Sequence, residues 1–233
     1  MKDTARTEIE RVCNAIYQAI FERRLEPNTR LVESQLAKAL STSRANARQA
    51  LLLLAQRKLV KITQNKGAVV AEPSKAEAHE VFAARRCIER EVILHVCERC
   101  TPENTKILRD HLKVERQARE SHDHFELIRA TGKFHVLLAE IAGNAVLLDF
   151  LEQLIARSSL ILENFKTHND QTCQEWHHKE LVKFISDRKV EKAQDLMDEH
   201  LKEIEQVLHY KRKTKPADLT EVFAPFLENH QTS

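Results

Sequence analysis

The sequence predicts a mainly α-helical protein in which an N-terminal winged helix-turn-helix precedes an all-helical antiparallel bundle of six or seven helices. Three observations lead to this prediction. Only 3 glycines and 5 prolines occur among 233 residues, and 42% hydrophobic with 31% charged residues is typical of helical globular proteins. Apolar residues recur at helical spacing over most of the chain, and a period of two replaces that spacing between positions 60 and 70. The length is sufficient for two domains.

The first helix is expected over residues 8–24, and the turn at residues 26–29 ends it. Its apolar residues share one face of a helix and are expected to pack inward. They are Ile9, Val12, Ile16, Ile20 and Phe21.

A second helix over residues 34–40 and a third that begins after Ser43 form the predicted helix-turn-helix, with Ser43 as the N-cap. Arg44 and Arg48 are one helical turn apart, so both guanidinium groups lie on one face. Arginine pairs bidentately with O6 and N7 of guanine in the major groove, so this helix is predicted to read DNA. The expected core face consists of Ala47, Ala50, Leu51, Leu53, Leu54 and Leu59.

Residues 60–70 predict a β-hairpin around Gln64-Asn65-Lys66-Gly67, which completes a winged helix-turn-helix. Gly67 permits the turn, and the basic tip is expected to approach DNA. Residues 1–75 contain 14 Lys and Arg against 7 Asp and Glu, a net charge of +7, and the rest of the chain has −5. The basic part is therefore the candidate for binding a polyanion, with Arg30 and Lys66 contacting phosphate or a groove edge.

The composition of Glu72-Pro73-Ser74 indicates a linker, with Ser74 as a candidate N-cap for the next helix. Only helical patterns follow up to residue 210. They are interrupted at Thr101-Pro102, Ser121 to Asp123, Gly143-Asn144, Thr167 to Cys173 and Ser186-Asp187. The predicted organisation is a DNA-binding domain over 1–72, a linker over 73–77, a helical domain over 78–212 and a tail over 213–233. Val222, Phe223, Phe226 and Leu227 of the tail are candidates for a docked segment or a dimer contact.

A cytoplasmic protein without a membrane partner is expected. No stretch reaches the roughly 18 to 20 apolar residues of a membrane span, and the N-terminus lacks the apolar core of a signal peptide. Five scattered cysteines favour reduced thiols over a disulfide framework: Cys13, Cys87, Cys97, Cys100 and Cys173. Cys97 and Cys100 form a Cys-x-x-Cys, but without a second pair two buried structural thiols are expected rather than a zinc site.

The first seventy residues resemble the GntR family of bacterial transcription regulators. The resemblance is carried by Pro27 to Leu31, Leu31-x-Glu33-x-x-Leu36-Ala37, Ser43-Arg44-x-x-x-Arg48-x-Ala50-Leu51, Leu59-Val60 and Gly67-x-x-Val70. There are departures from the family pattern. Asn28 stands where the family usually has Gly, Ala45-Asn46-Ala47 replaces Thr-Pro-Val, and Gln49 replaces Glu. None of these removes an arginine, but the lost Pro bears on how the recognition helix begins.

The helical part resembles the FadR C-terminal (FCD) type of effector domain, close to its VanR branch. The matching motifs are Arg85-x-x-x-Glu89, Phe134-His135-x-x-Leu138, Gly143-Asn144-x-x-Leu147, Leu154-x-x-Arg157, and His178 with His200. In this subfamily an Asp and three His commonly hold a divalent metal, against which a carboxylate effector binds. The resemblance places the histidines at His135, His178 and His200, and Thr131 stands where the Asp is expected.

Three imidazoles suit Zn, Ni or Mn and leave coordination positions open for water or a ligand carboxylate. With Thr131 in place of Asp, three outcomes stay open: a three-histidine site completed by water or effector, a weak site filled only with effector, or a lost site in a polar cavity. His177 is expected near the site or exposed rather than as a ligand. Arg85 and Arg157, with Thr131, are candidate effector contacts, although each arginine also suits an interhelical ion pair. Glu89 is expected to be structural.

The functional prediction is a ligand-responsive transcription regulator, a repressor that binds a palindromic double-stranded DNA operator as a homodimer. The resemblance implies a small organic acid as effector. One alternative is a metalloregulator in which the metal itself is the signal. The distant alternative, a metal-dependent hydrolase, lacks a matched general base, a nucleophile motif and a phosphate loop, so a non-enzymatic protein is expected.

Overall fold

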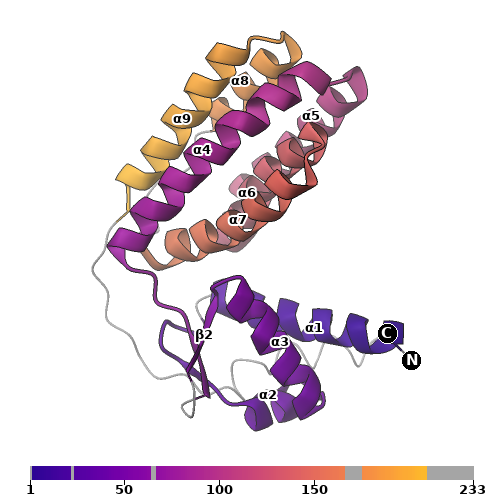
Figure 1. Ribbon diagram of the computed structural model, residues 1–233, viewed down its shortest axis with the longest axis vertical. Helices are drawn as coiled ribbons and strands as arrows, with labels where there is room; N and C mark the ends of the chain where they lie inside the picture. The colour runs from indigo at the N-terminus through magenta and orange to yellow at the C-terminus, as the bar shows by residue number, and fades with distance from the viewer. Residues whose placement is uncertain (1, 22–23, 64–66, 166–174, 209–233) are drawn as a thin grey trace. The chain divides into compact units, whose positions relative to one another are not determined.

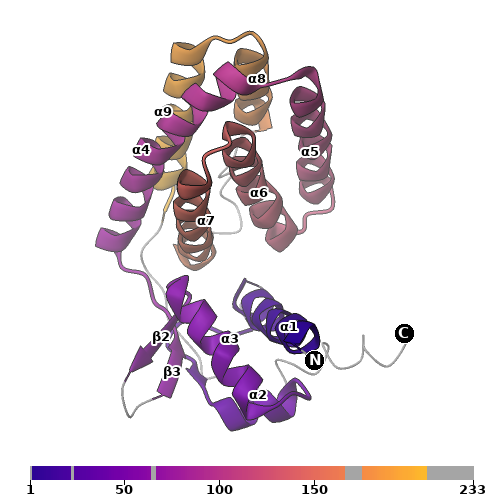
Figure 2. The ribbon, with the colours of Figure 1, turned by 45° about the vertical axis from the view of Figure 1, so that its right-hand side comes forward.

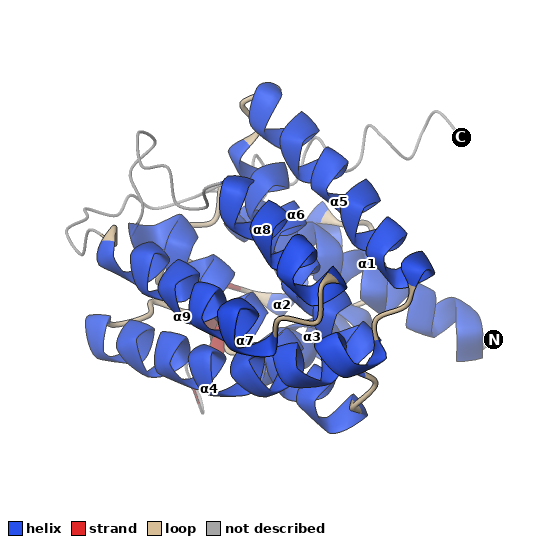
Figure 3. Cartoon of the chain, turned by 90° about the horizontal axis from the view of Figure 1, so that it is seen from above, coloured by secondary structure: helices blue, strands red, loops and turns tan. Residues whose placement is uncertain are grey.

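A computed structural model describes residues 2–21, 24–63, 67–165 and 175–208 of the chain (Figure 1). The chain divides into two compact units, one ending at Pro73 and the next beginning at Ser74. Helices dominate the described residues, and the strands are confined to a small sheet (Figure 3). The predicted mainly α-helical fold is confirmed. No helix in the described ranges is both long and apolar enough to span a membrane.

The first unit contains three helices and three short strands among its described residues (Figure 2). They are α1 (Lys2–Phe21), β1 (Arg30–Leu31), α2 (Glu33–Ala39), α3 (Arg44–Gln56), β2 (Val60–Thr63) and β3 (Gly67–Val70). Helix α1 begins six residues before the predicted start at residue 8. The apolar period marks only the packed part of a helix, and an existing helix extends into polar residues at little cost.

Both α1 and α2 pack against α3 around an apolar core that includes Ile16, Leu36 and Leu54. One predicted core residue is wrong, because Leu53 is 41% exposed. The helical period turns it away from the face that Ala50 and Leu54 bury. Leu59 is fully buried as predicted, although it lies beyond the end of α3.

The antiparallel sheet has the strand order β1-β3-β2, with Val60 opposite Val70 and Arg30 opposite Val69. The predicted hairpin is therefore present, although residues 64–66 of its tip, including Lys66, lie outside the described residues. Strand β1 was not predicted, because two residues are too few to show alternation. Gly67 has a φ of +82°, a conformation that residues with a Cβ rarely adopt.

The second unit contains six helices among its described residues, in agreement with the predicted bundle. They are α4 (Lys75–Arg99), α5 (Pro102–Glu120), α6 (His124–Ala142), α7 (Ala145–Phe165), α8 (Glu175–Ser186) and α9 (Val190–Gln206). Helix α4 begins inside the predicted linker 73–77, because the Ser74 hydroxyl accepts a hydrogen bond from the Glu77 amide and caps the helix there. The tail over 213–233 lies outside the described residues.

The predicted breaks at Thr101, at residues 121–123 and at Gly143 each separate two helices, and each has a local cause. Thr101 forms a capping box with Asn104 at the start of α5. The Asp123 carboxylate accepts from the Glu126 amide at the start of α6, and Gly143 ends that helix with a φ of +68°.

The long helix α4 packs against α6, α7 and α9, while α5 packs against α6 and α8 (Figures 1 and 2). Phe82 of α4, Leu108 of α5 and Phe134 of α6 are fully buried in this core. The inward faces of α4 to α9 each bury polar residues as well, and several of these form the candidate site. The Cys97 thiol is buried, which raises its pKa to about 11, whereas Cys100 is half-buried, so only one of the two predicted buried thiols is fully enclosed.

Candidate functional site

A groove in the first unit collects the arginines that the sequence assigned to DNA. It has a volume of about 330 Å³ and lies between the start of α2, the exposed face of α3 and the sheet. Arg44 and Arg48 line it from α3, Arg30 from β1 and Gly67 from β3. The three arginines are exposed and have no carboxylate partner within the described residues. Four of the six predicted DNA-binding residues therefore surround one groove.

Two apolar residues that the sequence analysis did not select also line this groove. Leu52 and Ile62 are 41% and 45% exposed, a large fraction for such side chains. An apolar side chain in a major groove contacts the methyl group of thymine. The sequence offered a signal for each of them. Leu52 is an apolar residue outside the core face of α3, and Ile62 is an apolar residue on the outer face of the hairpin.

Ser43 does not line the groove but fixes where the recognition helix α3 begins. Its hydroxyl accepts a hydrogen bond from the Asn46 amide at 3.1 Å, so the predicted N-cap is confirmed. The family's usual Pro at position 46 has no N–H to donate, so Asn46 supplies a capping bond that the family pattern lacks. The lost Pro therefore leaves the start of the helix intact.

The turn before β1 accounts for a second departure from the family pattern. Asn28, which replaces the usual Gly, has a φ of +66°, and Asn adopts this region more readily than most residues. Its side-chain amide donates to the Glu72 carboxylate at 2.7 Å, which ties the turn to the end of the unit.

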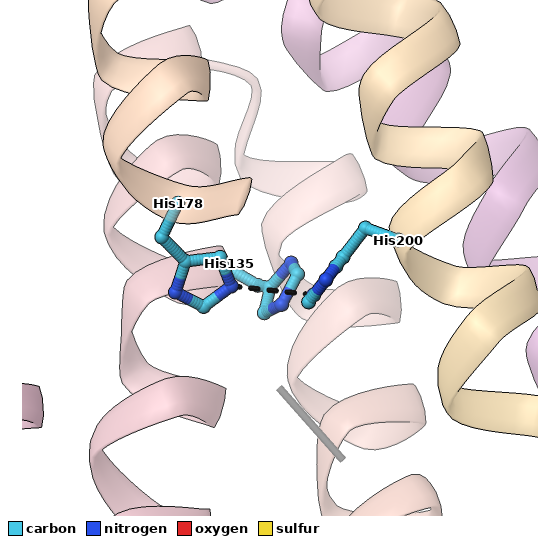
Figure 4. A group of neighbouring side chains, drawn as sticks. All are labelled: His135, His178 and His200. Atoms are coloured by element: carbon cyan, nitrogen blue, oxygen red, sulfur yellow. Dashed lines mark hydrogen bonds between the residues drawn. The ribbon is translucent and has the colours of Figure 1, made fainter. Parts of the chain in front are cut away.

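His135, His178 and His200 converge in the core of the second unit from α6, α8 and α9 (Figure 4). All three are buried, and one ligand nitrogen of each lies within 4.8 Å of the others. The Nε2 atoms of His178 and His200 are 3.2 Å apart. Ligands at about 2.0 to 2.1 Å from a zinc ion stand about 3.3 Å apart, so small movements would complete a shared coordination shell. The trio that the resemblance selected is therefore one spatial cluster.

Two buried carboxylates contact the Nδ1 atoms of two of the histidines and orient their rings. Glu89 of α4 pairs with His135 Nδ1, and Glu115 of α5 lies 2.9 Å from His178 Nδ1. Because a carboxylate accepts, each Nδ1 carries the proton and each Nε2 keeps its lone pair for a metal. Glu115 was missed by the sequence analysis, and Glu89 was assigned a structural role only. An acidic residue on the core face of an amphipathic helix was the available signal for both.

A cavity of about 20 Å³, room for about one water molecule, adjoins the trio. Arg85, Thr131, His135 and His200 line it. The Arg85 Nε donates to Glu89 and its Nη1 donates to Ser158 Oγ at 3.1 Å, but its buried Nη2 has no partner within the described residues. Arg85 is therefore placed to receive an anion in this cavity.

Thr131 and Arg157, the other two candidate effector contacts, already have hydrogen-bond partners. Thr131 lines the cavity, but its hydroxyl donates to the Leu127 carbonyl of its own helix at 2.9 Å. Arg157 does not line the cavity, and its Nη2 donates to Glu77 of α4 at 2.8 Å. The interhelical ion pair that was the alternative for Arg157 is the arrangement in this structure.

Burial lowers the pKa of His135 to about 4 and that of His178 to about 3. Burial also lowers the pKa of His200 well below 6.5, so all three imidazoles are neutral near neutral pH, as metal ligands must be. Burial opposes ionisation of Glu89, but Arg85 and His135 outweigh it and lower the pKa of Glu89 to about 2. His177 is also buried, beside His200, and neither ring nitrogen has a hydrogen-bond partner within the described residues.

These pKa shifts predict that metal-free protein loses stability as the pH falls below 6.5, the value for an unburied imidazole. Folding lowers the pKa of His135 and His178, so the unfolded chain binds more protons, and the free energy of unfolding decreases as the pH falls from 6.5 toward about 4. Glu89 weakens the fold only below its ordinary pKa of 4.5. Urea unfolding of metal-free protein at several pH values measures the effect. A wild-type free energy that is constant between about pH 7 and pH 5 would contradict it.

Models of known families match residues in both units of the chain. The model for bacterial regulatory proteins of the gntR family matches residues 8–70, and the FCD domain model matches residues 80–203. The chain belongs to the GntR family. This GntR protein is a transcriptional regulator with an FCD domain, as the resemblance implied, and the VanR-like branch stays a prediction. The family is a class of regulators without enzymatic activity, so the hydrolase alternative is set aside.

Curated relatives extend over most of the regulator. YdhC of Bacillus subtilis strain 168, an uncharacterized HTH-type transcriptional regulator, is 27% identical over 218 residues, which cover 93% of this chain and 86% of YdhC. The HTH-type transcriptional repressor NanR of Klebsiella aerogenes is 27% identical over 197 residues, 74% of each chain.

Solved structures agree in fold. Escherichia coli McbR/YncC superposes with a TM-score of 0.71 at 20% identity, covering 84% of this chain and 93% of that one. A GntR regulator from Rhodococcus sp. RHA1 gives a TM-score of 0.75 at 21% identity, covering 88% of this chain and all of that one. At these identities the similarity establishes the architecture alone.

Proposed function

We propose that this GntR regulator is a ligand-responsive repressor that binds a palindromic operator in the cytoplasm. The observation that carries the proposal is the groove in which Arg30, Arg44 and Arg48 meet around the capped start of α3. Arg44 and Arg48 on α3 face outward together, as direct reading of guanine requires. The name of the NanR relative favours repression over activation.

A homodimer follows from the small number of bases that one recognition helix reaches, since two-fold pairing doubles the contacts with a palindromic site. Helix α7 offers the interface. Its Val146 and Phe150 are one turn apart and are 63% and 54% exposed, more than the other large hydrophobic residues of the described ranges. Contiguous exposed apolar patches commonly mark protein contacts, and we assign this role to the pair.

Phe150→Glu is expected to weaken the dimer by at least about tenfold, because it places a charge in the apolar contact. Analytical ultracentrifugation over a range of concentrations measures the dissociation constant. Ile107→Glu is the matched control, since Ile107 on α5 is 48% exposed and lies on another helix. Equal dimerisation of both variants would remove α7 from the interface.

We further propose that His135, His178 and His200 hold a divalent metal. The donor set fits, because Glu89 and Glu115 accept from Nδ1 of two histidines, which leaves their Nε2 atoms as the ligand nitrogens, and the three imidazoles are neutral and enclosed. When bound, the metal would supply a localised positive charge and open coordination positions for an anionic ligand. The chain's own contribution is to hold the imidazoles of His135 and His178 in fixed tautomers and to exclude bulk water.

The effector class proposed is a small organic acid that uses Arg85. The unpartnered Nη2 of Arg85 provides a charge-assisted donor, and Ser158 holds the guanidinium in place. A cavity of about 20 Å³ is too small for such an acid, so binding requires an opened form of the bundle. An acid that binds this form better than the closed one shifts the population of the two, which is the requirement for a response at the DNA.

The metalloregulator remains the second candidate, because the same small cavity accommodates a metal-bound water without any opening. In that case the metal alone would change operator affinity. The acid and metal mechanisms therefore differ in what must be added to release DNA.

The test is a screen of organic acids against the complex of the protein with an operator selected from genomic fragments. One acid is expected to raise the operator dissociation constant by about 5- to 150-fold. Arg85→Gln is expected to abolish this response and keep operator binding. Arg86→Gln is the matched control, since Arg86 is the next residue of α4 and pairs with Glu205 away from the cavity. Release by metal alone would establish the metalloregulator, and failure to select any operator would contradict the regulatory role.

A further inference from the structure

A second candidate binding site lies on the outside of the bundle, in a groove between α5 and α8 with a volume of about 270 Å³. The two helices pack against each other along this seam (Figures 2 and 3). Five cationic residues line the groove: Arg109, Lys113 and Arg116 from α5, and Lys179 and Lys183 from α8. Neither the DNA-binding groove nor the histidine cluster uses any of them.

The basic residues line the groove because of their helical spacing. Arg109, Lys113 and Arg116 are four and three positions apart, so they form one edge of α5. Lys179 and Lys183 are four positions apart and form the facing edge of α8. Leu112 and the buried Val182 lie between the two basic edges and give the groove an apolar floor.

This concentration of positive charge stands in an acidic unit. Residues 74–210 contain 20 Lys and Arg against 25 Asp and Glu, and five of those 20 basic residues surround this one groove. No carboxylate lines it within the described part of the chain. Crowded like charges repel, and a bound anion would relieve that repulsion.

The existing counter-charges are weakly held. Lys113 pairs with Asp110 at 2.7 Å and Lys183 with Glu180 at 3.1 Å. In both pairs the lysine is exposed and the carboxylate belongs to the same helix, and exposed pairs of this kind contribute little to stability. Arg109 and Lys179, one on each wall, form no ion pair within the described residues. An incoming anion therefore meets little competition at these four side chains.

We propose that the α5–α8 groove binds a small organic phosphate. Arginine and lysine together are the side chains that recognise phosphate groups, with Arg109 able to form a bidentate contact. Five cations exceed what a single carboxylate would neutralise and suit the two negative charges of a phosphate ester. The apolar floor accommodates its carbon skeleton. The volume lies just under the range of about 300 to 1,000 Å³ for drug-sized ligands, which favours a small metabolite.

Binding at this groove would also act on the interior of the bundle. Arg116 and Lys179 directly follow Glu115 and His178, whose side chains meet at 2.9 Å. A phosphate that bridges both basic edges holds α5 and α8 at the separation which this buried contact requires. The ligand is therefore expected to stabilise the bundle, and this effect needs no metal. Phosphate binding is therefore expected whether or not the histidine cluster holds a metal.

The experiment uses the full chain freed of metal by a chelator, with glycerol 3-phosphate, glucose 6-phosphate and inorganic pyrophosphate as phosphate probes and succinate as a dianion without phosphate. Calorimetry and thermal unfolding measure binding and stabilisation. At least one of the two organic phosphates, glycerol 3-phosphate or glucose 6-phosphate, is expected to bind saturably with a dissociation constant below about 1 mM, and succinate is expected to bind at least about tenfold more weakly.

The paired variant Arg109→Gln, Lys179→Gln is expected to weaken phosphate binding by at least about tenfold. Both side chains are exposed, so the fold is expected to persist. Lys106→Gln, Lys192→Gln removes the same charge from exposed positions of α5 and α9 outside the groove and is expected to bind as the wild type does. The proposal is overturned if neither organic phosphate binds, if succinate binds equally well, or if the two paired variants bind the phosphate with equal affinity.

Discussion

A variant with alanine at His135, His178 and His200 is expected to contain no divalent metal, whereas the wild type purified without a histidine tag contains about one ion per chain. The three imidazoles come from three helices, and Glu89 and Glu115 orient two of them. Removing all three leaves one arginine, hydroxyl groups and apolar side chains around the cavity, a donor set poorly suited to Zn or Ni. Elemental analysis of both proteins measures the difference.

The control must separate loss of ligands from loss of fold. A matched variant replaces three histidines outside the cluster, His79, His95 and His122, with alanine and is expected to keep its metal. Circular dichroism and operator binding report whether the buried substitutions disturb the bundle or the DNA-binding unit. Metal that survives in the buried triple variant would place the ion elsewhere.

Whether the metal site is retained or lost depends on position 131, where Thr131 replaces the expected Asp. Its hydroxyl is neutral and donates to the Leu127 carbonyl, so the position contributes no charge to a metal. Thr131→Asp adds a carboxylate one helical turn before His135 and is expected to raise metal affinity by at least about tenfold. If the wild type stays empty and Thr131→Asp fills, the histidines are well placed and the substitution alone accounts for the loss. If neither protein takes up metal, the proposed metal site is wrong.

The elements that the sequence predicted well are those with local causes. Ser43, Ser74 and Thr101 cap the helices that were expected to begin beside them, because capping depends on residues three positions apart. The hairpin was visible from its period of two and from Gly67. Strand β1 was not, since its two residues are ordered by pairing with β3, a contact that no local pattern encodes.

In the candidate site, too, the sequence analysis missed what depends on contacts between distant segments. The resemblance identified the histidine trio, yet Glu115 was missed because its role depends on α5 and α8 lying side by side. Arg157 was chosen for its charge, but charge alone does not specify the direction of a side chain, and Glu77 of α4 engages it. The groove between α5 and α8 was likewise hidden, since its two basic edges are some 70 positions apart in the sequence.

Arg44→Ala is expected to weaken operator binding by about 1 to 3 kcal/mol per half-site and to relax the preference at one base pair. Arg44 lies in the first turn of α3, exposed beside Arg48, and α3 begins at a capped N-terminus. A bidentate contact with guanine is lost when the guanidinium is removed, while the contacts with phosphate are kept. Competition among operators that differ at single positions measures the change in preference.

Arg30→Ala is the comparison that separates a contact with a base from a contact with phosphate. Arg30 lies in β1 at the edge of the same groove, where a phosphate contact is expected. Its loss should weaken binding to all sequences about equally and reduce the slope of log K against log salt by about 1 per half-site. Lys66 at the hairpin tip is predicted to act in the same way. If Arg44→Ala also lowered affinity uniformly, Arg44 would be a phosphate contact, and the reading of bases would rest on Arg48 and on the apolar contacts of Leu52 and Ile62.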